Sequence, residues 1–131
     1  MGVRYLSDEW ISTVAQVIAT DVDIATLAAS HPIRVVQMVT GGPNGDVTYH
    51  FVTGASGVAF AAGTVADPDI TFTQTWHTAV SIASGAANAA EAFINGRVRF
   101  TGDHAKVIAA QPLFAALDRV FTAVRSSVDF S

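Results

Sequence analysis

The sequence predicts an α+β fold in which helices cover one face of a five-stranded sheet. Five stretches alternate apolar and polar side chains with the period of two that is typical of strands. Other stretches repeat apolar residues every three or four positions, which places those residues on one face of a helix. The chain has 131 residues, a length that fits one domain and allows about two thirds of the unfolded chain's surface to be buried.

The amino-terminal part is predicted to be helical. Ser7 is the expected N-cap of a helix over residues 7–20, and Asp8 and Glu9 place carboxylates at the positive end of its dipole. A second short helix is predicted over residues 21–29. The apolar face of the first helix consists of Trp10, Val14, Val17 and Ile18.

Three strands with short connections follow. They are predicted within residues 33–39, 47–51 and 58–62, and turn-forming residues fill the segments 40–46 and 53–57. Consecutive strands joined in this way form an antiparallel meander. The sequence therefore predicts a sheet with one face buried and the other exposed to water.

The second half of the chain returns to the sheet twice. A fourth strand is predicted over residues 70–73 and a fifth over 98–101. Between them, residues 76–83 and 89–93 show helical spacing on either side of Gly85. We expect these two short helices to form a loosely tied roof over an apolar interior that can open.

The last part of the chain is predicted to be helical. Asp103 is positioned to cap a short helix that extends to Ile108, and Pro112 fits the first turn of the final helix. The apolar stripe of that final helix consists of Leu113, Leu117, Val120, Phe121 and Val124.

The composition limits the classes of function. Half of the residues are hydrophobic and only 14% are charged, against roughly 25% charged in an ordinary soluble domain. The apolar surplus must lie in a core, be covered by a partner subunit or line a cavity. The net charge of −4, without a run of basic residues, argues against nucleic acid or an anionic membrane as a standing partner.

No membrane span and no targeting signal is predicted. Residues 47–66 and 70–90 lack charged side chains and are long enough to cross a bilayer, but both contain turn residues and polar side chains. The amino terminus lacks the apolar region of a secretory signal, and the last residues carry no organelle address. The expected location is the cytoplasm.

The search for catalytic and metal sites is largely negative. Without cysteine the chain has no thiol nucleophile or thiolate metal site, and its glycines form no phosphate-binding loop, so neither a metal nor a cofactor is predicted. Asp67 and Asp69 could act as an acid and a base, but caps of a turn are the favoured interpretation. Ser56 is interpreted as part of a hairpin turn. The four histidines show no metal-binding spacing: His31, His50, His77 and His104.

A set of apolar residues on several elements is the candidate ligand site. Each of them taken singly is more often plain core than the wall of a binding site, since apolar stripes are how helices dock. The predicted ligand-binding residues are Trp76, Val80, Phe93, Phe100, Leu113, Phe114, Leu117 and Phe121.

Two segments resemble one known family. They are Pro68-Asp69-Ile70-Thr71-Phe72 and Ala92-Phe93-Ile94-Asn95-Gly96-Arg97-Val98-Arg99-Phe100-Thr101-Gly102-Asp103. Together with the order of elements, they are similar to the lipid-binding domain of sterol carrier protein type two, over roughly residues 30–121. The resemblance implies a five-stranded, mainly antiparallel sheet with helices over one face, which enclose a hydrophobic tunnel for sterols, fatty acyl chains or fatty acyl-CoA. The chain looks like a stand-alone bacterial member.

The resemblance implies intracellular binding and transfer of an apolar lipid, with no shared catalytic residues. Only Arg97 and Arg99 stand close together as basic groups, which argues against recognition of the phosphates of CoA. The main alternative is an enzyme or accessory subunit that holds a steroid or terpenoid intermediate, with His77, Asp69 or Tyr49 reaching into the cavity. Two further alternatives remain. The apolar surplus could be covered in a homodimer, and the protein could contact membranes transiently.

Overall fold

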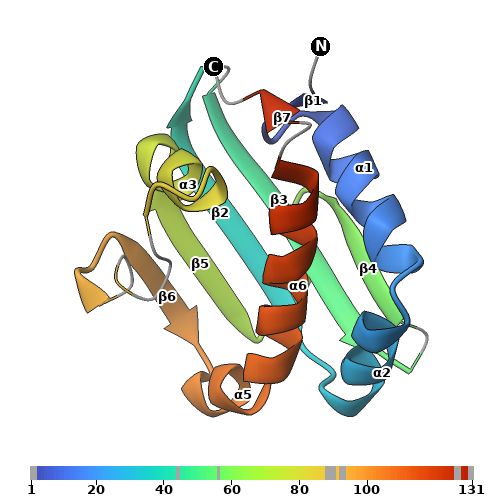
Figure 1. The fold of residues 1–131 in the computed structure, drawn as a ribbon. Coiled ribbons are helices and arrows are strands. Elements are labelled where there is room, and N and C mark those ends of the chain that lie inside the picture. The colour runs from blue at the N-terminus through green and yellow to red at the C-terminus, as the bar shows by residue number, and fades with distance from the viewer. Residues whose placement is uncertain are drawn as a thin grey trace.

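The computed structural model has the predicted α+β architecture (Figure 1). The structure describes residues 3–43, 45–55, 57–87, 91, 94–125 and 128–129. Within them the helices are α1 (Asp8–Ala19), α2 (Val22–Ser30), α3 (Trp76–Ala83), α5 (His104–Ala109) and α6 (Gln111–Val124). The strands are β1 (Val3–Arg4), β2 (Arg34–Gly42), β3 (Gly45–Gly54), β4 (Gly57–Ala62), β5 (Ile70–Thr75), β6 (Val98–Gly102) and β7 (Val128–Asp129).

The main sheet has five strands in the order β4-β3-β2-β5-β6. The predicted meander of β2, β3 and β4 is antiparallel, and β5 pairs antiparallel with β6. β5 lies beside β2 and runs parallel to it. The prediction of a mainly antiparallel, five-stranded sheet is confirmed, and the parallel central pair makes it a mixed one.

Side chains at the helix starts explain where the helices begin. The Ser7 hydroxyl accepts a hydrogen bond from the backbone N–H of Trp10 at 3.1 Å, and Asp103 accepts one from Lys106 N at 3.1 Å. Both residues satisfy a backbone donor that the helix itself leaves unpaired. Thr75, the last residue of β5, caps α3 in the same manner, so the chain passes from strand to helix without a loop.

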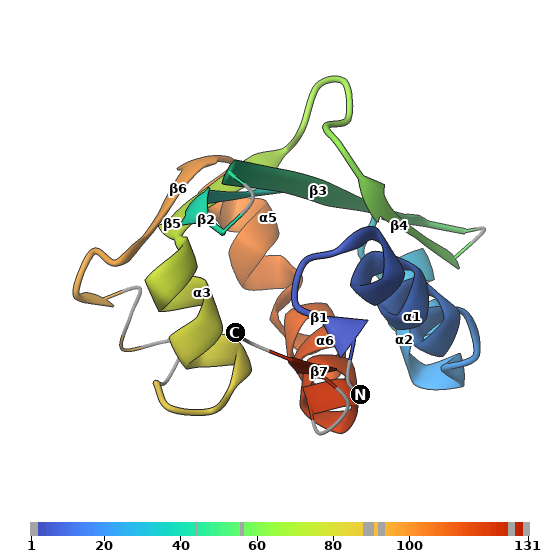
Figure 2. The ribbon, with the colours of Figure 1, turned by 90° about the horizontal axis from the view of Figure 1, so that it is seen from above.

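All described helices lie on one side of the sheet (Figure 2). We call the sheet face that they cover the inner face. Its side chains form three rows across the strands, because residues paired in register point to the same side. The first row is Phe60, Phe51, Val35 and Ile70, the second is Tyr49, Gln37, Phe72 and Phe100, and the third is Val47, Val39, Gln74 and Val98.

The three rows differ in how tightly they are covered. Every residue of the first row is buried, with Val35 and Ile70 inaccessible to solvent. In the second and third rows, all residues except Tyr49 and Val39 are partly exposed. The core is therefore solid at the first row and looser toward the third.

Aromatic contacts join α1 and α6 to each other and to the sheet. Trp10 of α1 stacks on Phe121 of α6 with ring centroids 5.9 Å apart. Phe114 of α6 meets Phe51 at 6.0 Å and Phe72 at 6.1 Å, in edge-to-face geometry. Such pairs contribute about 0.5–1.5 kcal/mol beyond the burial of their area.

No single helix in the described part of the chain is long and apolar enough to cross a bilayer, although α1 and α2, bent by 85° at their junction, reach that length and composition together.

Candidate functional site

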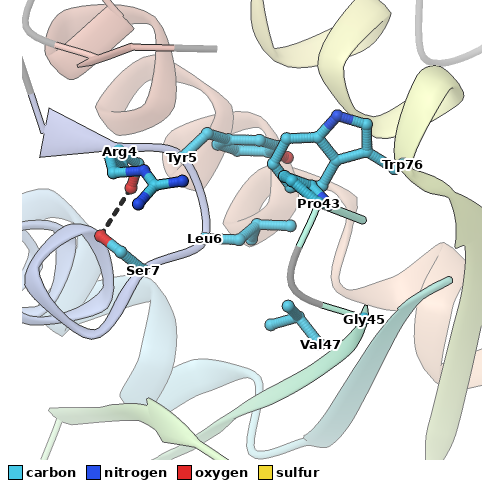
Figure 3. Close-up of a pocket in the computed structure, with 8 residues that line it drawn as sticks. All are labelled: Arg4, Tyr5, Leu6, Ser7, Pro43, Gly45, Val47 and Trp76. Carbon is cyan, nitrogen blue, oxygen red and sulfur yellow. Dashed lines mark hydrogen bonds between the residues drawn. The ribbon is translucent and has the colours of Figure 1, made fainter. Parts of the chain in front are cut away.

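A small pocket opens at the loose end of the inner face (Figure 3). It has a volume of about 120 Å³. Tyr5, Leu6, Val47 and Trp76 supply its apolar walls, and the rings of Tyr5 and Trp76 lie 5.4 Å apart. The remaining lining residues are Arg4, Ser7, Pro43 and Gly45.

A tight turn before α1 directs two of these walls inward. Ser7 folds back on Arg4, whose carbonyl oxygen accepts hydrogen bonds from the Ser7 hydroxyl at 2.6 Å and the Ser7 N–H at 3.1 Å. Leu6 adopts a φ of 62° in this turn, a conformation uncommon for a side chain of its size. Tyr5 and Leu6 are 9% and 5% exposed. The turn therefore buries two apolar side chains against the end of the sheet.

Trp76 forms the opposite wall because it follows β5 directly. Its ring lies over Gly42 of β2, where a Cβ atom would be 3.1 Å from Trp76 Cε3 and 2.9 Å from the Gly45 carbonyl oxygen. A glycine at this position lets the indole approach the strand closely. Trp76 is thus the predicted site residue that lines the pocket.

The other predicted site residues divide into two groups. Val80, Phe100, Phe114 and Phe121 are partly buried and pack against the core from α3, β6 and α6. Leu113 and Leu117 are 0% and 2% exposed, so they lie completely inside the protein. Phe93 falls outside the described residues.

Three of the four residues that form the apolar walls of the pocket were not predicted as site residues from the sequence. Tyr5 and Leu6 follow a strand of only two residues, too short to give a periodic pattern. Val47 was assigned to a strand, and its place on the inner face follows from its pairing with Val39. The alternation in β3 predicts that Val47 shares a face with Tyr49 and Phe51, but it does not reveal which end of that face is open.

The three polar residues considered for acid–base chemistry, His77, Tyr49 and Asp69, differ in their burial and in their partners. His77 is exposed on α3. Tyr49 is buried on the inner face, and its burial raises the pKa of its hydroxyl. Burial likewise raises the pKa of Tyr5, with a smaller contribution from the charge that Tyr49 would carry. Both phenols are therefore protonated at neutral pH and neither acts as a base.

Asp69 is engaged in holding the sheet together. Its carboxylate accepts hydrogen bonds from Lys106 Nζ at 2.7 Å and Arg34 N at 2.9 Å. The bond from Lys106 lowers the pKa of Asp69, and the Arg34 N–H adds to the effect. The carboxylate thus connects β2 with α5 at the entrance of β5, as a turn residue. Asp67 stands beside it with a φ of 51°.

Comparison with known proteins gives one family and a consistent fold. The model of the SCP-2 sterol transfer family matches residues 14–115. No curated protein matches the chain by sequence. A conserved hypothetical protein from Thermus thermophilus, described as possibly a sterol carrier protein, has a similar structure, with a TM-score of 0.71 at 13% identity, over 98% of this chain and 92% of that one.

Two further solved structures are similar, one over nearly its whole chain and the other over a small part of an enzyme. A crystal structure of sterol carrier protein 2 matches with a TM-score of 0.72 at 12% identity, over 95% of this chain and 99% of its own. The stereoselective inverting sec-alkylsulfatase Pisa1 from a Pseudomonas species matches with a TM-score of 0.53 at 16% identity, over 79% of this chain but 15% of the enzyme. At these identities the similarity shows the fold alone.

Proposed function

Because the chain belongs to the SCP-2 sterol transfer family, we propose that it binds a single apolar lipid between its inner face and its helices and transfers it between membranes or proteins. The lipid class is a sterol, a fatty acid or a molecule of similar shape. The whole chain acts as one lipid-binding domain in the cytoplasm, without a catalytic role.

The observation that carries this proposal is that apolar side chains of α3, β6 and α6 over the inner face are only partly buried. Apolar side chains from three elements are partly exposed there, and they include five of the predicted ligand contacts: Trp76, Val80, Phe100, Phe114 and Phe121. Side chains at a fully packed core would be buried like Leu113 and Leu117. We propose that the five partly exposed residues, with Phe93, contact the lipid, and that Leu113 and Leu117 form the floor beneath them.

Loading a lipid requires the helices to move apart. The pocket beside Trp76 holds about 120 Å³, which is less than the roughly 150 Å³ of an engineered cavity that admits benzene. A hydrophobic tunnel long enough for a lipid is therefore proposed for the loaded state. We propose that α3 moves, because only Thr78 and Ala79 of its eight residues are buried and its first residue, Trp76, lines the pocket.

The expected affinity is that of a carrier. Sequestering a sixteen-carbon chain from water stabilises the complex by about 12 kcal/mol at ~0.8 kcal/mol per methylene. Immobilising the two partners costs about 4–15 kcal/mol. Dissociation constants in the micromolar range are the expected result, so the protein would equilibrate lipid with a membrane during transient contacts.

The test is titration of delipidated protein with a fluorescent fatty acid or sterol. We expect binding below ~50 μM, about 5.9 kcal/mol, and a loss of at least ten-fold in Val80→Trp, whose larger side chain would fill the space under α3. Ser12→Trp on the exposed side of α1 is the matched control and should bind normally. Absence of binding by the unmodified protein at ~50 μM would end the proposal.

The enzyme alternative has one structural observation in its favour. The sec-alkylsulfatase contains a segment with this fold, and Tyr49 faces the interior. A raised pKa makes Tyr49 a poor base, so it would serve only as a hydrogen-bonding group in a reaction. Native mass spectrometry of freshly purified protein separates the two functions, since a carrier returns its passenger chemically unchanged. The same measurement gives the mass of the assembly and tests for a homodimer.

A further inference from the structure

Two glutamine side chains interrupt the apolar inner face. Gln37 stands in the second row, between Tyr49 and Phe72, and Gln74 stands in the third, between Val39 and Val98. The carbonyl oxygens of both side chains are buried and accept no hydrogen bond from any residue that the structure describes. Buried acceptors of this kind are rare in folded proteins, because they lose their bonds to water without replacement.

The two carbonyl groups belong to one niche. Gln37 pairs with Phe72, and Gln74 lies two residues further along the same strand as Phe72, so the glutamines are diagonal neighbours on one face of the sheet. Gln37 points to the side where the helices lie, because its register partners Tyr49 and Phe72 contact Trp10 of α1 and Phe114 of α6. Gln74 points to the same side, because it lies two residues after Phe72 on β5. Gln74 also shares its row with Val47, a wall of the pocket.

The surroundings of this niche are apolar and uncharged. The described inner-face residues of β2, β3, β5 and β6 carry no charged side chain, and Tyr49 is protonated because its burial raises its pKa. A carboxylate or phosphate placed against the two carbonyl oxygens would meet no cation among the described inner-face residues of the sheet, which is unfavourable. An uncharged hydroxyl group, which has one proton to donate, would satisfy one of the two acceptors at a time.

We propose that Gln37 and Gln74 bind the hydroxyl group of the passenger lipid, so that the preferred ligand is an uncharged alcohol. The hydroxyl donates to a glutamine carbonyl while the hydrocarbon part lies against the partly exposed apolar side chains. This inference rests on the proposed lipid binding and adds the polar end of the ligand and its location. The inference predicts that fatty acids and acyl-CoA bind with lower affinity than alcohols of the same chain length.

A competing arrangement would place a carboxylate at the pocket mouth. Arg4 lines the pocket and is exposed, so its guanidinium could bind the carboxylate of a fatty acid that enters tail first. The two arrangements predict opposite orders of affinity. In the first the alcohol binds better than the acid, and in the second the acid binds better and loses its advantage in Arg4→Gln.

The experiment compares three ligands of one chain length by displacement of a fluorescent probe. They are 1-dodecanol, its methyl ether and dodecanoate. We expect the alcohol to bind about ten-fold more tightly than the ether, which keeps the oxygen but has no proton to donate. Gln37→Leu and Gln74→Leu should each reduce this ratio, and the double variant should abolish it. Gln16→Leu, on the exposed side of α1, should leave the ratio unchanged.

Each further outcome has a defined meaning. Equal binding of alcohol and ether, a preference that survives in the double variant, or tightest binding of dodecanoate would overturn the inference while the proposed lipid binding stands. If none of the three ligands and no sterol probe binds, the proposed function and the inference fall together.

A second measurement does not depend on ligand. Removal of an unpartnered buried acceptor should raise the melting temperature of the ligand-free protein by about 3 °C in each leucine variant. 1-Dodecanol should then raise the melting temperature of the unmodified protein more than that of the double variant. Gln37→Met and Gln74→Met, which keep the chain length, provide the same test if a leucine variant fails to fold. A lower melting temperature in both pairs of variants would contradict the inference.

Discussion

Arg125 Nε donates a 2.7 Å hydrogen bond to the carbonyl oxygen of Ala83 and so joins the C-terminal ends of α6 and α3. The guanidinium lies close over Gly85, where a Cβ atom would be 2.7 Å from Nη1. A cation at this position also interacts favourably with the negative end of the α3 dipole. This contact holds α3, the helix that we propose moves when a lipid enters.

We therefore expect Arg125→Met to release ligand faster. The variant loses one charged hydrogen bond, which is worth about 1 kcal/mol at a partly buried site, and release should accelerate about five-fold. Stopped-flow transfer of a fluorescent lipid to vesicles measures this rate. Arg119→Met, at an exposed position of α6, is the control, and an equal effect of both variants would exclude a role for the contact with Ala83.

The pair of Asp69 and Lys106 predicts a pH dependence of stability. The pKa of Asp69 is lowered from its ordinary value of 3.8 in the folded protein, chiefly by the hydrogen bond from Lys106. Its contribution is complete above about pH 4 and is lost as the pH falls through the folded pKa. At pH 7, Asp69→Asn should lower the free energy of unfolding by about 1 kcal/mol, since the pair is partly exposed.

Urea denaturation between pH 7 and pH 2.5 measures this effect. The difference between the unmodified protein and Asp69→Asn should shrink as the pH falls below about 4, where Asp69 becomes protonated in the unfolded chain. It should vanish once the pH is also below the pKa of Asp69 in the folded protein, because both proteins then carry an uncharged side chain at this position. Asp118→Asn, on the exposed side of α6, should track the unmodified protein throughout. A constant difference across the pH range would contradict the assignment.

Two glycines with positive φ should tolerate alanine very differently. At Gly102, with φ of 126°, a Cβ atom would overlap the carbonyl oxygen of Asp69 and lie 2.8 Å from Ile70 Cα. At Gly96, with φ of 75°, no atom of the described part of the chain lies within 4 Å of the Cβ position. Gly96→Ala should cost only the conformational strain, about 1–2 kcal/mol. Gly102→Ala should cost about 4 kcal/mol or prevent folding, and similar losses in both variants would show that the close approach to Asp69 is wrong.

The hydroxyl of Thr53 connects β3 to the segment before β2. It donates to the carbonyl oxygen of His31 at 2.6 Å and accepts from Ile33 N at 2.8 Å, and Thr53 is 5% exposed. Thr53→Val keeps the shape and leaves both backbone groups without this partner, so we expect a loss of about 2 kcal/mol in the free energy of unfolding. Thr53→Ser should retain most of the stability in thermal denaturation. A valine variant as stable as the unmodified protein would show that these bonds contribute nothing.

Local interactions made much of the fold predictable. The caps at Ser7 and Asp103 act on backbone N–H groups three residues away, so sequence alone is enough to place them. The strands of the meander were recognisable from their alternation. The parallel pairing of β2 with β5 was not predicted, because more than thirty residues separate Val35 from its partner Ile70 and no local signal specifies the pairing.

The site was predictable to a smaller extent. Trp76 was identified from its helical spacing, but its neighbours Tyr5 and Leu6 reach the pocket through a turn that leaves no periodic signal. Gln37 and Gln74 occupy positions that apolar residues fill elsewhere in their rows. That the two glutamines are neighbours on the inner face depends on the pairing of β2 with β5, and the sequence alone does not give this pairing.

The short parallel pair of β1 and β7 places both extremities of the domain together, with Val3 opposite Val128. Arg4 and Tyr5, which follow directly, belong to the pocket wall. A purification tag or a fused protein at either extremity would consequently emerge next to the pocket mouth. Transfer assays should use protein from which the purification tag has been cleaved. A protein fused at either extremity would lie close enough to the pocket to receive the lipid directly.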